Sequence, residues 1–207
     1  NYFGFPLERF LAFEQPGMPA LAVHDIGDLQ RATAFGTVVL AADGMHVAGF
    51  EEKPQAPKST LVSTGCFFLP AATLPILVSF ATEHPDNVGG IVEEFVARQI
   101  PVTCFRFTEP WFDIGSFEAY LEATKTLVSE RILSAPSAII NDTTCSGSVV
   151  VGNHCMIKQS TLENTVLFED CEIIDCVLRD CILDNGCTLR GIDLSGKMLR
   201  AGTTLTQ

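Results

Sequence analysis

The sequence predicts an α/β domain followed by a three-sided β-solenoid, and two patterns carry this prediction. In residues 1–134, runs rich in β-branched and aromatic residues alternate with amphipathic helical segments, as is typical of a layered α/β architecture. From Ile139 the helical periodicity fades, and short aliphatic runs return at a regular spacing. We therefore expect two domains, residues 1–134 and residues 135–207.

The composition is that of a globular chain, with 47% hydrophobic residues among 207 and a formal net charge of -12. The negative charge argues against nucleic acid or an anionic membrane as a partner. No apolar run reaches the roughly 18 residues that span a membrane, and no basic segment followed by an apolar one indicates a signal peptide. We expect a cytoplasmic protein whose eight cysteines are reduced thiols.

The first domain combines expected strands, expected helices and one β-hairpin. The hairpin consists of two strand-like runs, 35–41 and 45–52, joined by the turn residues ADG. Further strands are expected at 18–26, 59–69 and 100–107, helices at 6–15, 73–84, 89–99 and 116–133, and a polar connection at 27–32. The helix over 116–133 is the clearest, because Ser116 is suited to cap its N-terminus.

The second domain is predicted from a hidden repeat. Each unit is a small residue, any residue and an aliphatic residue, and the units begin at residues 155, 160, 165, 171, 176, 181 and 187. The steps of 5, 5 and 6 residues place three short strands in each 16-residue coil, and about four coils are expected. Side chains two apart on a strand share a face, so both the small and the aliphatic residue face inward. Cys155, Cys171 and Cys187 then stack in one column; a disulfide is conceivable there, but three cysteines cannot all pair.

Two charged stretches are candidates for chemistry. GFEEKP places Glu51, Glu52 and Lys53 where a strand leaves the sheet. This stretch is either a solvated turn or a binding site for a sugar phosphate. The second reading rests on chemistry, because an ammonium suits phosphate and a carboxylate accepts hydrogen bonds from hydroxyl groups. PWFDIGS places Asp113 between bulky residues at a strand-to-helix junction. There Asp113 either caps the helix or holds a divalent cation.

Glycines mark the same region. Gly36, Gly65 and Gly115 lie at expected strand edges, where a missing side chain lets a ligand approach the backbone, although a turn explains each as well. The sequence contains no GxxxxGK[ST], GxGxxG, GxSxG or HExxH motif.

Taken in order, three stretches resemble the sugar-phosphate nucleotidyltransferase family, the NDP-sugar synthases or pyrophosphorylases. They are FGTVVLAADGMHVAGFEEKPQAPKSTLVSTGCFFLP, VGGIVEEFVARQ and WFDIGSFEAYLEA, and the resemblance covers roughly residues 1–130. It implies a mixed-sheet, Rossmann-like domain followed by a left-handed parallel β-helix with hexapeptide-like repeats. The implied reaction is attack of a sugar-1-phosphate on the α-phosphorus of a nucleoside triphosphate, with release of pyrophosphate.

The resemblance also implies a role for each matching residue. Lys53 would bind the sugar-1-phosphate, Glu52 would hold sugar hydroxyls, and Asp113 would be one carboxylate ligand of Mg²⁺. The backbones of Gly36 and Gly65 would line the sugar pocket. A homo-oligomer assembled through the β-helix is expected, because exposed strand edges tend to pair.

One family feature is missing from this sequence. The Gly-rich nucleotide-binding signature is absent, and NYFGFPLERFLAF resembles the stretch just after the family's Gly-Asp-Asn segment. We expect a C-terminal part of the catalytic domain that has no nucleotidyltransferase activity as an isolated chain. The alternatives are a non-catalytic subunit that senses sugar phosphates or mediates assembly, and a β-helix acyltransferase that uses His154 as a base.

Overall fold

The computed structural model describes residues 1–13 and 15–207, which divide into two compact units. The first unit is Tyr2–Trp111, and the second is Phe112–Gln207 together with Asn1. The domain boundary expected after residue 134 stays a prediction.

The first unit is built around a five-stranded mixed sheet in the order β4-β3-β5-β2-β6. Only β2 and β6 run parallel, and the other neighbours are antiparallel. The elements, in chain order, are β1 Tyr2–Phe3, α1 Leu7–Leu11, β2 Ala20–Asp25, α2 Leu29–Ala32, β3 Gly36–Leu40, β4 Val47–Glu52, β5 Leu61–Phe68, the 3-10 turn Ala71–Thr73, α3 Leu74–Glu83, the 3-10 turn Val88–Gly90, α4 Ile91–Ala97, β6 Thr103–Phe107 and β7 Trp111–Phe112. β1 pairs with β7 in a separate two-stranded sheet. The mixed sheet expected from the sequence is confirmed.

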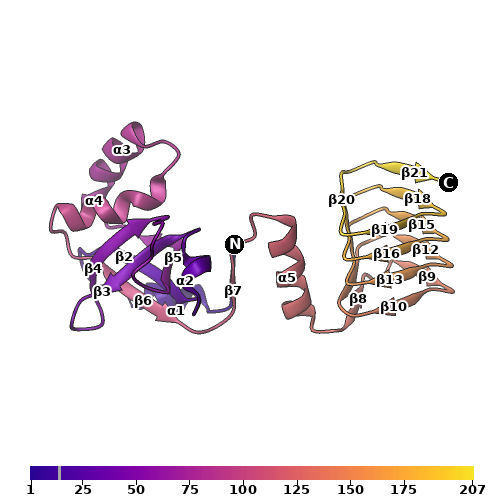
Figure 1. The fold of residues 1–207 in the computed structure, drawn as a ribbon, viewed down its shortest axis with the longest axis horizontal. Helices are drawn as coiled ribbons and strands as arrows, with labels where there is room; N and C mark the ends of the chain where they lie inside the picture. The colour runs from indigo at the N-terminus through magenta and orange to yellow at the C-terminus, as the bar shows by residue number, and fades with distance from the viewer. Residues whose placement is uncertain (14) are drawn as a thin grey trace. The chain divides into compact units, whose positions relative to one another are not determined.

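Helices cover one face of this sheet, and phenylalanines pack on the other. α3 and α4 lie together on one side (Figure 1). There Phe95 and Ile91 pack with Leu21, Val23 and Val38 in a common core. On the other face, β2 and β6 contribute to a second core rich in aromatic rings, formed by Phe5, Phe10, Ala20, Ala22, Phe105 and Phe107. This alternation follows from the period-two geometry of the strands.

The β3–β4 hairpin is confirmed, and it bends farther than the sequence indicates. Gly36 pairs with Glu52 at the open end, and the register shifts before Leu40. At the closed end the Cys104 amide donates to the Met45 carbonyl (2.8 Å), and the Val47 amide donates to the Val102 carbonyl (2.9 Å). The tip of the hairpin therefore bonds to the chain at the start of β6, so the sheet curls toward a barrel.

Two expected segments of the first unit are wrong in detail. The helix expected over 6–15 covers only Leu7–Leu11, and Glu14 lies outside the described residues. The expected polar connection at 27–32 contains α2 instead. Asp28 caps this helix, because its carboxylate accepts hydrogen bonds from the amides of Gln30 (2.8 Å) and Arg31 (3.1 Å).

The first element of the second unit is α5 (Phe117–Val128), which ends five residues earlier than expected. Ser116 caps it as predicted, since its hydroxyl accepts a hydrogen bond from the Ala119 amide at 3.1 Å. The helix ends because Ser129 takes the left-handed conformation (φ 53°). Arg131 then secures the last turn by donating from Nε to the Val128 carbonyl (2.7 Å).

A parallel β-solenoid follows α5 and forms three sheets (Figure 1). The strands are β8 Ile132–Ser134, β9 Ile139–Asn141, β10 Thr144–Ser146, β11 Val149–Val151, β12 Met156–Lys158, β13 Thr161–Glu163, β14 Val166–Leu167, β15 Glu172–Ile174, β16 Val177–Arg179, β17 Ile182–Leu183, β18 Thr188–Arg190, β19 Asp193–Ser195, β20 Met198–Leu199 and β21 Thr204–Thr206. Two sheets have five strands and one has four, so the described solenoid has about five coils rather than the expected four. Successive strands pair 16 residues apart, as between Ile157 and Ile173. The repeat therefore has the predicted length.

Small residues at the corners of each coil bond to the next coil. Both members of every predicted unit are buried, from Cys155 and Ile157 to Cys187 and Leu189. The Cys155 thiol donates to the Phe168 carbonyl (2.8 Å), and the Thr165 hydroxyl donates to the Leu178 carbonyl (3.3 Å). The same bond to the carbonyl 13 residues ahead recurs at Cys171, Cys181 and Cys187. Five corners thus use a small side chain that donates to the next coil, whereas Ser160 and Cys176 donate to the carbonyl two residues before them.

All eight cysteines carry free thiols in this structure. No helix in the described part of the chain is long and apolar enough to cross a membrane.

Candidate functional site

Lys53 occupies a strained position at the point where β4 leaves the sheet. Its φ is 46°, a left-handed conformation that is uncommon for residues other than glycine. The Lys53 amide donates to the Phe35 carbonyl (3.1 Å), and Pro54 follows directly. Within the described residues its ammonium makes no hydrogen bond or ion pair. The neighbouring Lys58, by contrast, is paired with Glu51. The backbone is therefore fixed while the charge of Lys53 stays available.

Glu52 is the last residue of β4 and is half-buried. Burial raises the pKa of its carboxyl group; nearby Lys53 opposes this shift, and Glu93 adds to it. The Glu52 amide donates to the Glu93 carboxylate at 2.9 Å, which fixes the position of Glu93 beside the strand. Hydrogen-bond donors such as sugar hydroxyls would stabilise a half-buried carboxylate that lies beside a second acid.

Gly36 lies directly against Glu52, its partner in the β3–β4 ladder. A Cβ at Gly36 would lie 2.4 Å from Cζ of Phe50 and 2.7 Å from Oε2 of Glu52. Gly89, in the turn before α4, also approaches Glu52, since a Cβ there would lie 3.5 Å from the same oxygen. The structure therefore brings the predicted residues Gly36, Glu52 and Lys53 together.

Gly65 lies at a bulge in β5. Leu21 pairs with Phe67 and Val23 with Ser63, so three residues of β5 stand opposite Ala22. Gly65 takes a φ of 73° there, and a Cβ on it would meet open space. No contact joins it to Glu52 or Lys53 among the described residues, so its part in a sugar pocket stays a prediction.

Asp113 belongs to the second unit. Its carbonyl accepts a hydrogen bond from the Gly115 amide (3.0 Å), and the helix cap is supplied by Ser116 rather than Asp113. The Asp113 carboxylate is exposed and makes no hydrogen bond in the described chain. The described residues contain no group of three or more His, Cys, Asp or Glu side chains that could hold a metal. Asp113 can therefore supply one ligand only.

Sequence reasoning missed Glu93 and Gly89 as neighbours of Glu52. They lie 41 and 37 positions away in the chain, and only the fold brings them close. The one available signal was the acidic pair Glu93–Glu94 in the first turn of α4. Acidic residues are also common at the start of a helix, so this pair did not indicate a site.

His154, the base of the alternative acyltransferase hypothesis, lies at a solenoid turn. Its side chain is 70% exposed, and its Nδ1 lies 3.5 Å from Asp170, which is also exposed. It takes a left-handed backbone conformation (φ 56°) like several other turn residues. Nothing in this environment distinguishes His154 from a solvated turn residue.

Two family models match parts of this chain. The family model described as "Nucleotidyl transferase" matches residues 2–130, which is more than half of the chain. The chain belongs to the nucleotidyl transferase family. A second model, described as "GlmU-like, C-terminal hexapeptide", matches residues 119–194, which include most of the solenoid.

Curated relatives of this chain include glucose-1-phosphate adenylyltransferases. The one from Thermomicrobium roseum is 34% identical over 116 residues, which cover 54% of this chain and 26% of the relative. The enzyme from Streptomyces coelicolor is 30% identical over 120 residues, covering 47% and 30%, and that from Ruminiclostridium cellulolyticum is 24% identical over 158 residues, covering 67% and 37%. The chain thus spans between about a quarter and two fifths of the length of these relatives.

Proposed function

We propose that this chain supplies the sugar-1-phosphate side of a sugar-1-phosphate nucleotidyltransferase site. The observation that carries the proposal is the contrast between two lysines of one segment. Lys58 is neutralised by Glu51, whereas Lys53 is held by its backbone and keeps an unpaired ammonium beside half-buried Glu52. From the names of the relatives, glucose 1-phosphate and ATP are the substrates we propose.

The roles of the two side chains follow from their chemistry. Lys53 binds the phosphate of the sugar-1-phosphate as a point charge. Glu52 accepts hydrogen bonds from sugar hydroxyls, and these bonds replace the water that burial removes from its carboxylate. A phosphate oxygen held in this way attacks the α-phosphorus of the triphosphate, and pyrophosphate leaves. Positioning and electrostatics supply most of the rate in such displacements, and the fixed backbone of Lys53 restricts where its ammonium can lie.

Asp113 fits the role of one carboxylate ligand for a divalent cation, which we propose is Mg²⁺. Its carboxylate is exposed and unpaired in the described residues, and Mg²⁺ is commonly bound by one or two carboxylates together with substrate phosphates. When bound, the ion would neutralise charge on the phosphates.

We also propose that the solenoid mediates assembly of a homo-oligomer in the cytoplasm. The first coil consists of strands β8, β9 and β10, and each of them pairs with only one described neighbour. Ile132, Leu133 and Ile139 on these strands are exposed. Open edges with apolar side chains favour pairing with another copy.

Isothermal titration of glucose 1-phosphate into the chain tests the role of Lys53. Lys53→Gln is expected to weaken binding about tenfold or more, because a charge-assisted hydrogen bond is lost. Lys58→Gln is the matched control, since it removes an equal charge from the same segment and is expected to leave the affinity within about twofold. Equal losses in both variants, or no binding by the unmodified chain, would contradict the proposal.

A further inference from the structure

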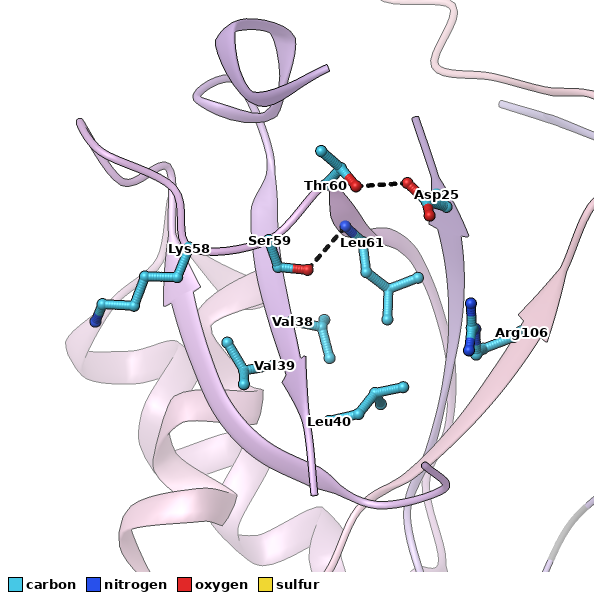
Figure 2. Close-up of a pocket in the computed structure, with 9 residues that line it drawn as sticks. All are labelled: Asp25, Val38, Val39, Leu40, Lys58, Ser59, Thr60, Leu61 and Arg106. Atoms are coloured by element: carbon cyan, nitrogen blue, oxygen red, sulfur yellow. Dashed lines mark hydrogen bonds between the residues drawn. The ribbon is translucent and has the colours of Figure 1, made fainter. Parts of the chain in front are cut away.

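A pocket lies on the curled sheet of the first unit. It has a volume of about 310 Å³ and is bordered by the ends of β2 and β6, by β3 and by the start of β5 (Figure 2). Lys53, Glu52 and Gly36 do not line it. The pocket therefore shares none of the three residues of the proposed sugar-phosphate binding site, and a ligand in it would not depend on that site.

Two opposite charges share this pocket without direct contact, although the charge of Arg106 helps to lower the pKa of Asp25. Asp25 and Arg106 both line it, and they form no direct ion pair in the described chain. The Asp25 carboxylate is fixed by the Thr60 hydroxyl (2.6 Å) and the Gly27 amide (3.0 Å), and both bonds reach Oδ1. The Thr60 bond is the main cause of the lowered pKa of Asp25, so the group stays ionised at neutral pH. Its second oxygen keeps its capacity to accept.

The other side of the pocket is aliphatic. Val38, Leu40 and Leu61 extend their side chains toward its centre, whereas Asp25 and Arg106 lie together on the opposite side (Figure 2). Val38 and Leu61 belong to the buried core, so this wall is firmly held. Lys58 borders the pocket, but its side chain points away and pairs with Glu51. Arg106 is therefore the cation that a ligand would meet.

We propose that this pocket binds a free α-amino acid with an aliphatic side chain. Arg106 would take the carboxylate through its planar, two-pronged guanidinium. The free oxygen of Asp25 would take the ammonium, and the wall of Val38, Leu40 and Leu61 would take the hydrocarbon side chain.

A zwitterion fits this arrangement better than an anion or a cation. A phosphate would gain Arg106 but would also face the fixed negative charge of Asp25. A simple amine would gain Asp25 but would face the positive charge of Arg106. A molecule of either kind therefore leaves one charge of the pocket unmatched. The volume of about 310 Å³ lies at the lower end of the range for ligand pockets, which suits a molecule of this size.

Calorimetric titration with a matched set of small molecules tests the proposal on the whole chain. L-leucine is the probe; 4-methylpentanoate lacks its ammonium, and 3-methylbutylamine lacks its carboxylate. L-leucine is expected to bind with a Kd in the millimolar range or tighter, and each truncated compound at least about tenfold more weakly, because each loses a charge-assisted bond.

Two variants separate a specific site from general charge effects. Asp25→Asn keeps an acceptor for Thr60 and Gly27 but removes the charge, and Arg106→Gln removes the cation; each is expected to weaken leucine binding about tenfold or more. Arg98→Gln is the control, since Arg98 lies just after α4 and pairs with Glu94. Amide shifts in NMR spectra report binding near Val38 and Leu61 independently of heat, and circular dichroism verifies that each variant is folded.

Three results would overturn the proposal. They are the absence of leucine binding at millimolar concentration, equal binding of leucine and 4-methylpentanoate, and equal losses in Arg106→Gln and Arg98→Gln. If a pocket variant fails to fold, the ligand series on the unmodified chain still decides the question.

Discussion

In the solenoid, the inward members of the predicted repeat units are small or aliphatic and almost inaccessible to water, whereas the sheet unit keeps Glu52 half-buried beside Glu93. In the solenoid, corner side chains such as Cys155 and Thr165 donate hydrogen bonds to backbone carbonyls of the next coil. The sheet unit instead leaves the ammonium of Lys53 unpaired among the described residues, whereas left-handed backbone occurs at turns of both units. An unpaired ammonium beside a half-buried carboxylate thus stands where a ligand is expected, which is typical of functional sites.

The largest expected effect is a loss of stability in the solenoid. Leu178 is fully buried and stacks between Leu162 and Leu194 in neighbouring coils. Leu178→Ala should lower the free energy of unfolding by about 2–5 kcal/mol, because the cavity cannot be filled by a rigid stack. Urea unfolding measures the loss. Thr188→Ala, on an outward position, should change it by less than about 0.5 kcal/mol.

A comparison of two glycines separates crowding from backbone strain. Gly36→Ala should cost about 1–3 kcal/mol, since its Cβ would overlap Phe50 and Glu52. Gly65→Ala meets open space and should cost about 1–2 kcal/mol, from its positive φ alone. Gly65→Asn should recover part of that loss, whereas Gly36→Asn should not. Thermal and urea unfolding of the four variants would show this difference, and recovery at both positions would refute it.

The corner rule of the solenoid predicts a nearly neutral exchange. Thr165 and Cys181 occupy equivalent corners one coil apart, and both donate to the carbonyl 13 residues ahead. Cys181→Thr should therefore change stability by less than about 1 kcal/mol. Cys181→Leu keeps the hydrophobicity but overfills the corner, and should cost about 1–3 kcal/mol. If the two variants unfold at the same urea concentration, side-chain volume does not govern the corner.

The smallest effect concerns the pH dependence that Glu52 brings. Its pKa is raised in the folded chain, so the folded state binds its proton more tightly than the unfolded state. Stability should then fall as the pH rises from the ordinary glutamate value of about 4.3 through the raised pKa. Glu52→Gln should remove this fall and stabilise the chain at pH 7 by less than about 1 kcal/mol, while weakening sugar-phosphate binding. Urea unfolding at pH 4 and pH 7 measures the difference, and Glu51→Gln is the control.

Much of the fold could be predicted from local signals. The spacing of the units at Cys155, Ser160 and Thr165 fixes the coil length, because a strand side chain has only two possible faces. Ser116 marks the start of α5 through cap chemistry that depends on neighbouring amides. The glycine–carboxylate contact of Gly36 and Glu52 follows from the hairpin that joins them.

The features that escaped prediction depend on contacts between distant parts of the chain. The bond from Cys104 to Met45 curls the sheet, and it joins residues that no local pattern relates. The meeting of Asp25 and Arg106 at one pocket depends on that curl and on the parallel pairing of β2 with β6. α2 was missed because four residues carry too little periodicity, although Asp28 signals its cap.

The buried corner thiols have a practical consequence for measuring motion. Cys155, Cys171, Cys176, Cys181 and Cys187 are each at most 2% exposed, so an alkylating reagent reaches them only when a coil opens. Peptide mass analysis after timed alkylation would assign an opening rate to the three coils that carry these thiols, without any introduced label. The order in which these five thiols react would reveal from which end the stack unwinds.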